Sequence, residues 1–183
     1  EGETRRVLGV IRPTAECIGQ ITHSRHVGIL ATSGTISSGS YPLEIRKLYP
    51  DIVVSGEACP MWVPLVENYE YDSPGADYFV EKRIGNLLRK DPAIDTIVLG
   101  CTHYPLLLNK ILKYTPRNVR IVPQGEYVAY SLKDYLQRHT EIETLCTQSG
   151  TCRFLTTESP DKFMESASIF LRQHVEAERV VLE

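Results

Sequence analysis

Short runs of apolar residues alternate with longer segments of helical periodicity along most of the chain. Runs rich in valine, isoleucine and leucine predict buried strands, and apolar residues that recur every three or four positions predict helices. Strands are expected at residues 7–11, 27–31, 52–54, 96–100, 119–122 and 153–157, with an edge strand at 180–182. Helices are expected at residues 14–22, 41–48, 59–69, 75–89, 105–113, 126–138 and 160–174. Residues 32–39 and 139–150 predict a small-residue turn and a polar loop.

This alternation is typical of an α/β fold with a mostly parallel sheet flanked by helices. A chain of 183 residues with 42% hydrophobic content can bury a real core. The length allows one domain, or one domain together with part of another.

Charge, hydropathy and cysteine content indicate which partners and which cellular compartment to expect. The formal net charge of −3 and the absence of any basic run give no electrostatic reason to expect nucleic acid or a membrane surface as partner. The sequence has no long uninterrupted apolar segment, so neither a spanning helix nor a secretion signal is expected. Five scattered cysteines do not form a disulfide framework, which favours a reducing, cytoplasmic compartment.

The strongest chemical signal lies at the end of the fourth expected strand. That strand ends at Gly100, Cys101, Thr102 and His103 follow it, and Pro105 opens a helix. A thiol at this point lies at the carboxyl edge of a sheet, where α/β proteins bind ligands, and just before a helix N-terminus, which favours the thiolate. Free cysteine is commonly a small buried hydrophobe, but the neighbouring hydroxyl and imidazole favour a functional role here.

A second polar stretch, Ala31 to Thr35, also follows a strand and precedes a helix. Its hydroxyl and backbone N–H groups suit a carboxylate or phosphate oxygen. The alternative is an ordinary loop in which Ser and Thr cap the next helix. The stretch lacks the spacing of a Walker phosphate loop and has no following lysine, so nucleotide binding is not expected.

Two further sets of residues leave alternatives open. Trp62 is expected in the core, whereas Glu67 is either an acid, base or charge partner, or a solvated helix carboxylate. Cys146 and Cys152 are spaced too widely for a usual zinc knuckle and have no matching second pair. We therefore expect no metal site.

Four stretches of the chain resemble the glutamate racemases, in the same order as in that family. Residues 99–107, LGCTHYPLL, resemble the second-cysteine motif. Residues 9–11, residues 28–32 with Thr35, and residues 59–67 are similar to three further family motifs. The resemblance runs from about residue 9 to residue 130. A histidine two residues after the cysteine points to the glutamate enzymes, because the related aspartate racemases typically carry a glutamate there.

The resemblance implies a cofactor-free amino-acid racemase, an isomerase that supplies D-glutamate for peptidoglycan precursors in the cytoplasm. Two cysteines flank glutamate in such enzymes, and one removes the α-proton while the other delivers a proton to the opposite face. The resemblance also allows a homodimer. Carried over to this sequence, it implies that the catalytic residues are Cys101, His103 and Glu67, and that the substrate-binding residues are Thr32, Thr35, Thr102 and His103.

One departure from the family is large. Its first half carries an Asp-Ser loop, a Tyr-Gly pair and an Ala-Cys-Asn-Thr-Ala motif with the first cysteine, and this sequence has none of them. Cys17 and Cys59 stand in other contexts and are no substitute. By analogy, residues 13–123 are expected to form the second of two α/β domains, and residues 1–12 and 124–183 to be the remnant of the first. The chain is then a fragment, inactive alone.

Two alternatives stay open beside that interpretation. The first is a non-catalytic domain that keeps the fold and the carboxylate-binding loops. The second is another enzyme of the aspartate and glutamate racemase family, one that needs only a single cysteine. Residues upstream of Glu1 would discriminate best between a racemase and a binding domain.

Overall fold

The computed structural model describes residues 7–182. The chain forms two compact units, which divide between Tyr135 and Leu136. No helix within the described part of the chain is both long enough and apolar enough to cross a membrane.

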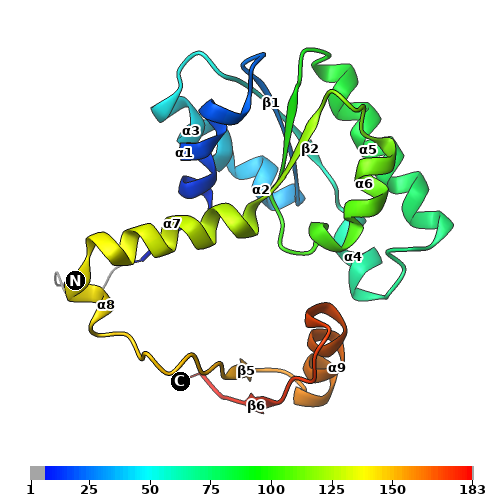
Figure 1. Ribbon diagram of the computed structural model, residues 1–183. Helices are drawn as coiled ribbons and strands as arrows, with labels where there is room; N and C mark the ends of the chain where they lie inside the picture. The colour runs from blue at the N-terminus through cyan, green and yellow to red at the C-terminus, as the bar shows by residue number, and fades with distance from the viewer. Residues whose placement is uncertain (1–6, 183) are drawn as a thin grey trace. The chain divides into compact units, whose positions relative to one another are not determined.

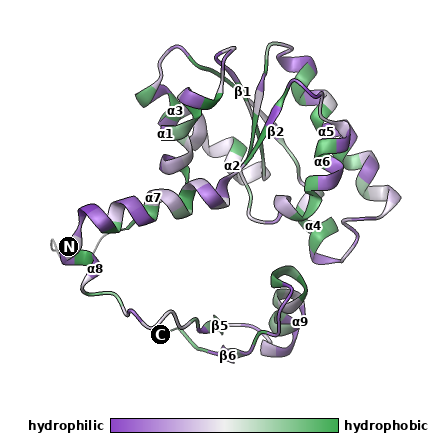
Figure 2. Cartoon of the chain, viewed as in Figure 1, coloured by the Kyte–Doolittle hydropathy of each residue, from purple (hydrophilic) through white to green (hydrophobic). Residues whose placement is uncertain are grey.

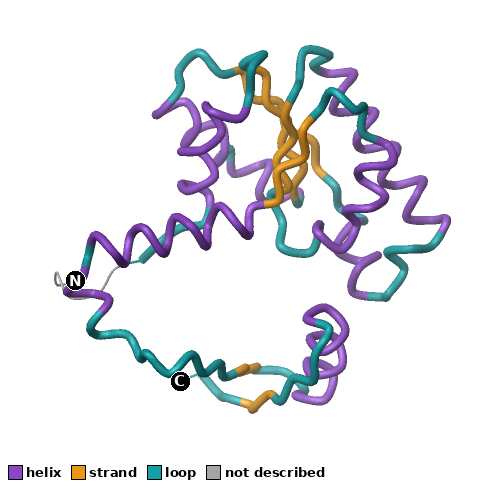
Figure 3. The backbone as a smooth tube through the Cα atoms, in the orientation of Figure 1, coloured by secondary structure: helices purple, strands orange, loops and turns teal. Residues whose placement is uncertain are grey.

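A parallel sheet forms the centre of the first unit (Figures 1 and 3). Its strands are β1 (His26–Ala31), β2 (Val53–Ala58), β3 (Thr96–Leu99) and β4 (Arg120–Pro123), arranged in the order β2-β1-β3-β4. Every neighbouring pair is parallel. All of their carboxyl ends therefore meet at one edge of the sheet, which confirms the predicted α/β class.

Helices cover both faces of this sheet, with α1 and α3 on one face and α5 and α6 on the other (Figure 1). Along these helices hydrophobic residues alternate with hydrophilic ones (Figure 2), as expected where only one side of a helix packs on a sheet. The helical elements of the first unit are α1 (Ile11–Ile21), α2 (Ser33–Ser38), α3 (Ser40–Leu48), α4 (Trp62–Glu67), α5 (Pro74–Lys90), the 3₁₀ helix η1 (Tyr104–Leu107) and α6 (Leu108–Tyr114), and α7 (Gln124–Arg138) begins there.

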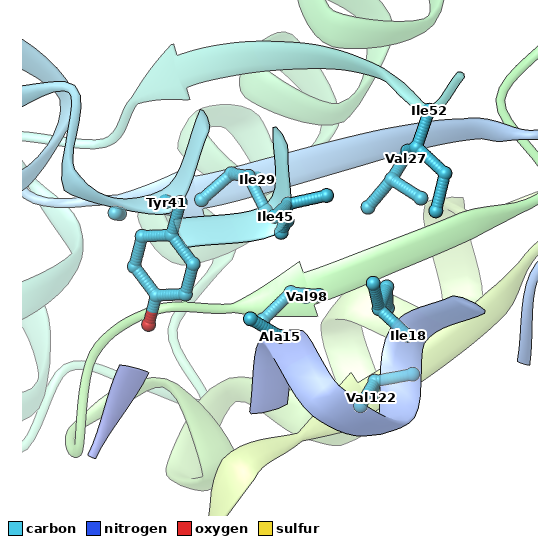
Figure 4. Packing of buried hydrophobic residues seen from close by; sticks show 10 residues of the cluster. Ala15, Ile18, Val27, Ile29, Tyr41, Ile45, Ile52, Val98 and Val122 are labelled. Atoms are coloured by element: carbon cyan, nitrogen blue, oxygen red, sulfur yellow. The ribbon is translucent and has the colours of Figure 1, made fainter. Parts of the chain in front are cut away.

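The core lies between the sheet and its two helical layers. On one face, Ile18 of α1 and Ile45 of α3 pack with Val27, Ile29 and Val98 of the central strands (Figure 4). Every residue of β3 is buried, as expected for a strand covered on both faces. Burial of each large aliphatic side chain contributes about 1.5–3 kcal/mol, so this core holds the strand ends at fixed positions.

The second unit is smaller and contains much less buried surface. Its elements are α8 (Thr140–Glu143), β5 (Phe154–Thr156), α9 (Pro160–Leu171) and β6 (Ala177–Arg179), and β5 pairs with β6 in parallel. Among its described residues only Val175 is buried. A two-stranded sheet with so little buried core is at best marginally stable by itself.

Most of the predicted strands are confirmed, but two predictions were wrong. Residues 7–10 form no strand, and Ile11 already begins α1. Pro13 does not stop that helix because its missing N–H falls in the first turn, where backbone N–H groups have no helical partner. At the other end the strand is Ala177–Arg179, and residues 180–182 lie beyond it. Residue 183, also part of the predicted tail, lies outside the described residues.

Two stretches predicted as loops contain short helices. Residues 32–39 hold α2, because Thr32 caps its first turn and Gly39, with φ of 63°, ends it in the left-handed conformation. Residues 139–150 contain α8. The helix expected from Pro105 is divided into η1 and α6.

Candidate active site

Three polar turns meet at the carboxyl edge of the sheet. They follow β1, β2 and β3 and contain Thr32, Cys59 and Cys101. Backbone hydrogen bonds extend the ladder into these turns: the Gly100 N–H donates to the Leu30 carbonyl at 2.8 Å, and the Cys59 N–H donates to the carbonyl before Thr32, also at 2.8 Å. The sheet therefore brings together the stretches that the sequence singles out.

Cys101, His103 and Glu67 form a continuous chain of polar contacts. The Cys101 Sγ lies 3.8 Å from the His103 Nδ1. On its other side, the His103 Nε2 lies 2.5 Å from the Glu67 Oε1. An imidazole between a thiol and a carboxylate can take the thiol proton while the carboxylate stabilises the resulting positive charge. The three residues that the resemblance assigns to catalysis are thus in contact.

This chain of contacts opens to solvent. The side chain of His103 is 28% exposed and that of Glu67 is 45% exposed, and Cys101 is partly exposed. A substrate can therefore reach the thiol from the edge of the sheet.

Packing behind the site fixes the distance between His103 and Glu67. Glu67 is the last residue of α4, and His103 directly precedes η1. Trp62 of α4 and Tyr104 of η1 are fully buried, and their rings meet edge to face with centroids 4.7 Å apart. This contact holds α4 against η1, and it confirms the predicted core position of Trp62.

Gly100 is closely packed where β3 runs into the Cys101 turn. A Cβ atom at this position would lie 3.1 Å from the Ala31 Cβ and 3.1 Å from both the ring edge and the hydroxyl of Tyr41. A side chain at this position would require Ala31 or Tyr41 to shift by a few tenths of an ångström.

The electrostatic setting of Cys101 differs from the one predicted from sequence. The element after the thiol is a four-residue 3₁₀ helix rather than the start of a long α-helix. A helix dipole acts on charges within about one turn of the helix end and is weak for a helix of one turn. It therefore contributes less to stabilising a thiolate at Cys101 than a long α-helix would. The close partner of the thiol is the His103 imidazole.

Thr32 and Thr35 contact each other. The Thr35 N–H donates to the Thr32 Oγ1 at 3.4 Å, and the two hydroxyl oxygens lie 3.0 Å apart. Thr32 is therefore a helix cap, the alternative that the sequence left open, and it is also at the edge beside Cys101. Thr102 is exposed on the neighbouring turn. The substrate contacts of these three threonines stay predictions.

A largely apolar hollow of about 140 Å³ lies beside Thr35, lined among others by Ile36 and Val54. Its walls offer little to a charged amino acid. We therefore place the candidate substrate site at the polar sheet edge and not in this hollow.

Cys59 lies at the same edge of the sheet but is not accessible to solvent. It is fully buried, and its thiol donates to the Glu57 carbonyl at a Sγ–O distance of 3.7 Å. Burial raises the pKa of the Cys59 thiol far above its ordinary value. Such a thiol stays protonated and does not exchange protons with a substrate.

Sequence reasoning missed Tyr41 as part of the site. Its spacing four residues before Ile45 predicts only that both side chains share a helix face. Burial raises the pKa of Tyr41 to about 12, while a hydrogen bond from Gln124 acts in the opposite direction and the charge of Cys101 raises the pKa further. No local signal could have found this contact, because Gln124 follows a different strand.

The remaining cysteines show no arrangement for chemistry. Cys17 lies on α1, where burial and then the Glu16 charge raise its pKa. Cys146 and Cys152 are exposed in the second unit. Within residues 7–182, no group of three or more His, Cys, Asp or Glu side chains could hold a metal ion.

Comparison with known proteins identifies the family. The sequence profile of the family described as Asp/Glu/Hydantoin racemase matches residues 6–126. A glutamate racemase of Thermoanaerobacter pseudethanolicus is 35% identical over 170 residues, which cover 93% of this chain and 63% of that protein. The chain therefore spans less than two thirds of that relative's length.

Two crystal structures share the fold. A glutamate racemase isoform of Bacillus anthracis matches with a TM-score of 0.87 and 34% identity, covering 96% of this chain and 65% of that one. A glutamate racemase of Francisella tularensis in complex with D-glutamate matches with a TM-score of 0.80 and 25% identity, covering 95% and 62%. From these matches and the geometry of the Cys101 turn, we conclude that the chain belongs to the Asp/Glu/Hydantoin racemase family.

Proposed function

We propose that the chain is part of a glutamate racemase in which Cys101 exchanges a proton with the α-carbon of glutamate. The observation that carries this proposal is the continuous contact from Cys101 through His103 to Glu67 at an open sheet edge. The relatives described as glutamate racemases support the choice of glutamate, and one of them is in complex with D-glutamate.

The reaction proceeds by proton transfer alone. The Cys101 thiolate takes the α-proton, and the electron pair of the broken C–H bond moves into the substrate carboxylate. A second acid then delivers a proton to the opposite face, which inverts the centre without a net change in oxidation state. The mechanism needs no cofactor. His103, supported by Glu67, accepts the thiol proton and prepares the thiolate.

Hydrogen-bond donors at the neighbouring turns complete this half of the site. Thr32, Thr35 and Thr102 bind the substrate carboxylate, where negative charge develops after proton removal. These donors also fix which face of the α-carbon meets the Cys101 sulfur.

Inversion requires a second acid on the opposite face, because a single fixed base returns its proton to the face from which it came. Neither Cys17 nor Cys59 suits this role, since the pKa of each is raised by burial. We therefore expect this chain to be inactive alone, and a protein that adds the first-cysteine half of a family member to be active.

The test is an assay of both proteins with L- and D-glutamate. Circular dichroism measures racemisation, and proton NMR in D₂O measures exchange at the α-carbon. The proposal predicts racemisation in the longer protein and its loss in Cys101→Ser. Full turnover in that variant, or turnover of aspartate in preference to glutamate, would overturn the proposal.

The cellular role belongs to the same proposal. D-Glutamate made in the cytoplasm supplies peptidoglycan precursors, as the resemblance implies. Complementation of a bacterial strain that requires D-glutamate, by the longer protein and by its Cys101→Ser variant, tests this role. Sedimentation of the longer protein tests the homodimer.

A further inference from the structure

The Tyr41 hydroxyl lies in the protein interior, next to the turn that contains Cys101. Tyr41 is only 3% exposed, and its ring packs in the core beside Ile29 and Ile45. Its hydroxyl end reaches the segment that follows β3 (Figure 4). A Cβ atom at Gly100 would lie 3.1 Å from this hydroxyl. The buried phenol therefore lies against Gly100, the residue next to the Cys101 thiol.

The partners of this hydroxyl determine how it is oriented. A hydrogen bond with the Gln124 side chain lowers the pKa of Tyr41, as an N–H donor to the phenol oxygen does. The Gln124 amide nitrogen also donates to the buried Thr14 Oγ1 at 2.9 Å. A phenol that accepts a hydrogen bond still has its own hydrogen to donate.

This phenol stays neutral throughout the pH range in which a thiol ionises. Burial raises the pKa of Tyr41 to about 12, whereas an ordinary cysteine titrates near about 8.5. A neutral buried donor favours a nearby anion, since it offers a dipole without competing charge. The titratable groups that act on Cys101 from the surrounding elements are His103, Glu67 through His103, Tyr41, Tyr104 and Cys59.

We propose that Tyr41 is a positioning residue for Cys101, in that its ring supports the Gly100 turn and its hydroxyl stabilises the thiolate from beneath. This inference rests on the proposed role of Cys101 as an acid and base. It adds a residue of α3, on the buried side of the turn, to a site whose other parts lie on the solvent side. Thiolate formation then depends on a donor on each side, His103 and Tyr41.

The test compares Tyr41→Phe with Tyr49→Phe in the chain as it stands. Tyr49 packs on the same core cluster, and its hydroxyl donates to the Glu16 carbonyl at 2.8 Å. Both variants lose one hydrogen-bonding hydroxyl and keep the ring, but Tyr49 is only partly buried and only Tyr41 lies at the Cys101 turn. Alkylation of the Cys101 peptide by iodoacetamide, followed by mass spectrometry from pH 5 to 10, measures the thiol titration directly.

We expect Tyr41→Phe to raise the titration midpoint of Cys101 by about 0.5–1 pH unit and to slow alkylation at neutral pH about 3- to 10-fold. Tyr49→Phe should leave both values unchanged. A purely structural role would lower the unfolding temperature without moving the midpoint. A folded Tyr41→Phe variant with the wild-type midpoint would overturn the proposal.

A second variant keeps the test decisive if Tyr41→Phe does not fold. Gln124→Met removes the amide that donates to the phenol and leaves Tyr41 in place. It weakens the phenol as a donor, so the midpoint of Cys101 should rise by a smaller amount in the same direction. An unchanged midpoint in this folded variant would count against the proposal. Neither readout involves glutamate, so a negative racemase assay with a shifted midpoint would reject the proposed function alone.

Discussion

The Cys59 turn and the Cys101 turn form a natural pair for comparison. Each thiol follows a parallel strand, β2 or β3, and each precedes a proline and a helix. Cys59 is nevertheless fully buried with a raised pKa, whereas Cys101 is partly exposed with an imidazole 3.8 Å away. Position at the edge of the sheet is therefore not sufficient for a reactive thiol.

Two adjacent residues account for the difference. His103 turns toward the Cys101 thiol and, on its other side, toward Glu67. Tyr104 turns inward, and its hydroxyl donates to the Cys59 carbonyl at 3.3 Å. The same short segment thus gives one thiol a basic partner and covers the other with an aromatic ring. Side-chain partners, rather than secondary structure, give the two thiols different surroundings.

If the proposed function is right, replacement of each thiol in a longer protein that adds the first-cysteine half should show the largest difference between the two turns. Cys101→Ser should lower kcat for racemisation by about 10³-fold or more, because a serine hydroxyl is too weak an acid to share the role. Cys59→Ser should change kcat by less than about threefold once any loss of stability is controlled. The coupled D-glutamate assay measures both, and equal losses in the two variants would contradict the assignment.

Thiol labelling of the unmodified chain should show the next largest difference. At pH 7.5 we expect Cys101 to alkylate about 100-fold faster than Cys59, since Cys59 must first be exposed by local unfolding. Cys17, whose pKa is raised by burial, should fall between them. Peptide mass spectrometry gives the rates, and labelling in denaturant serves as the control in which all sites react alike. Equal rates in the folded chain would remove the argument for a tuned thiol.

Glu57, two residues before Cys59, allows a test of how the Cys59 turn contributes to folding stability. Its carboxylate is buried, which by itself would raise its pKa, but hydrogen bonds from Lys90, Asn86 and Arg83 outweigh burial and lower the pKa. A group with a lowered folded-state pKa contributes stability above its unfolded pKa of about 4.3, and this contribution is lost as the pH falls.

We therefore expect Glu57→Gln to lower the free energy of unfolding at pH 7 by about 2 kcal/mol and to flatten its decline below about pH 4. Urea titrations at several pH values measure both effects. Glu81→Gln, on the exposed side of α5, is the matched control and should change stability by less than about 0.5 kcal/mol. A Glu57→Gln variant with slowed Cys101 labelling would show that the two turns are not independent.

The smallest expected effect concerns Glu67. Glu67→Gln keeps a hydrogen-bonding group near His103 but removes the negative charge, so under the proposed function kcat should fall about 10-fold in the longer protein. Glu70→Gln, an exposed neighbour three residues on, should leave kcat unchanged. The coupled D-glutamate assay measures kcat for both variants, and an equal loss in the two would contradict the role given to Glu67.

Local sequence patterns were sufficient to predict the central strands and part of the candidate site. The apolar runs predict the central strands because β1 and β3 are covered on both faces and need continuous hydrophobic sequence. The residues Gly100 to His103 predict a candidate thiol site because strand, turn and chemistry are adjacent in the chain.

Contacts between distant segments could not be predicted in the same way. The charge partner of His103 is Glu67, on a helix that precedes the motif by a full strand and helix, and nothing in either segment indicates the pairing. Helix α2 was missed because its serine- and glycine-rich sequence has low helix propensity, which capping by Thr32 and Gly39 overcomes. The strand expected at residues 7–11 failed because apolar spacing alone does not separate a short strand from a helix start.

The order of strands in the sheet has a consequence for how the protein is made. β1 pairs with β2 soon after both leave the ribosome, but its other edge stays open until β3 is synthesised, since Val27 pairs with Thr96. Throughout that interval an apolar strand presents unpaired backbone groups, the kind of edge that chaperones protect and aggregates recruit. The Cys101 turn is attached to the strand that closes this gap. This turn therefore meets Glu67 and the Cys59 carbonyl, which lie on earlier segments of the chain, only after that strand has been made.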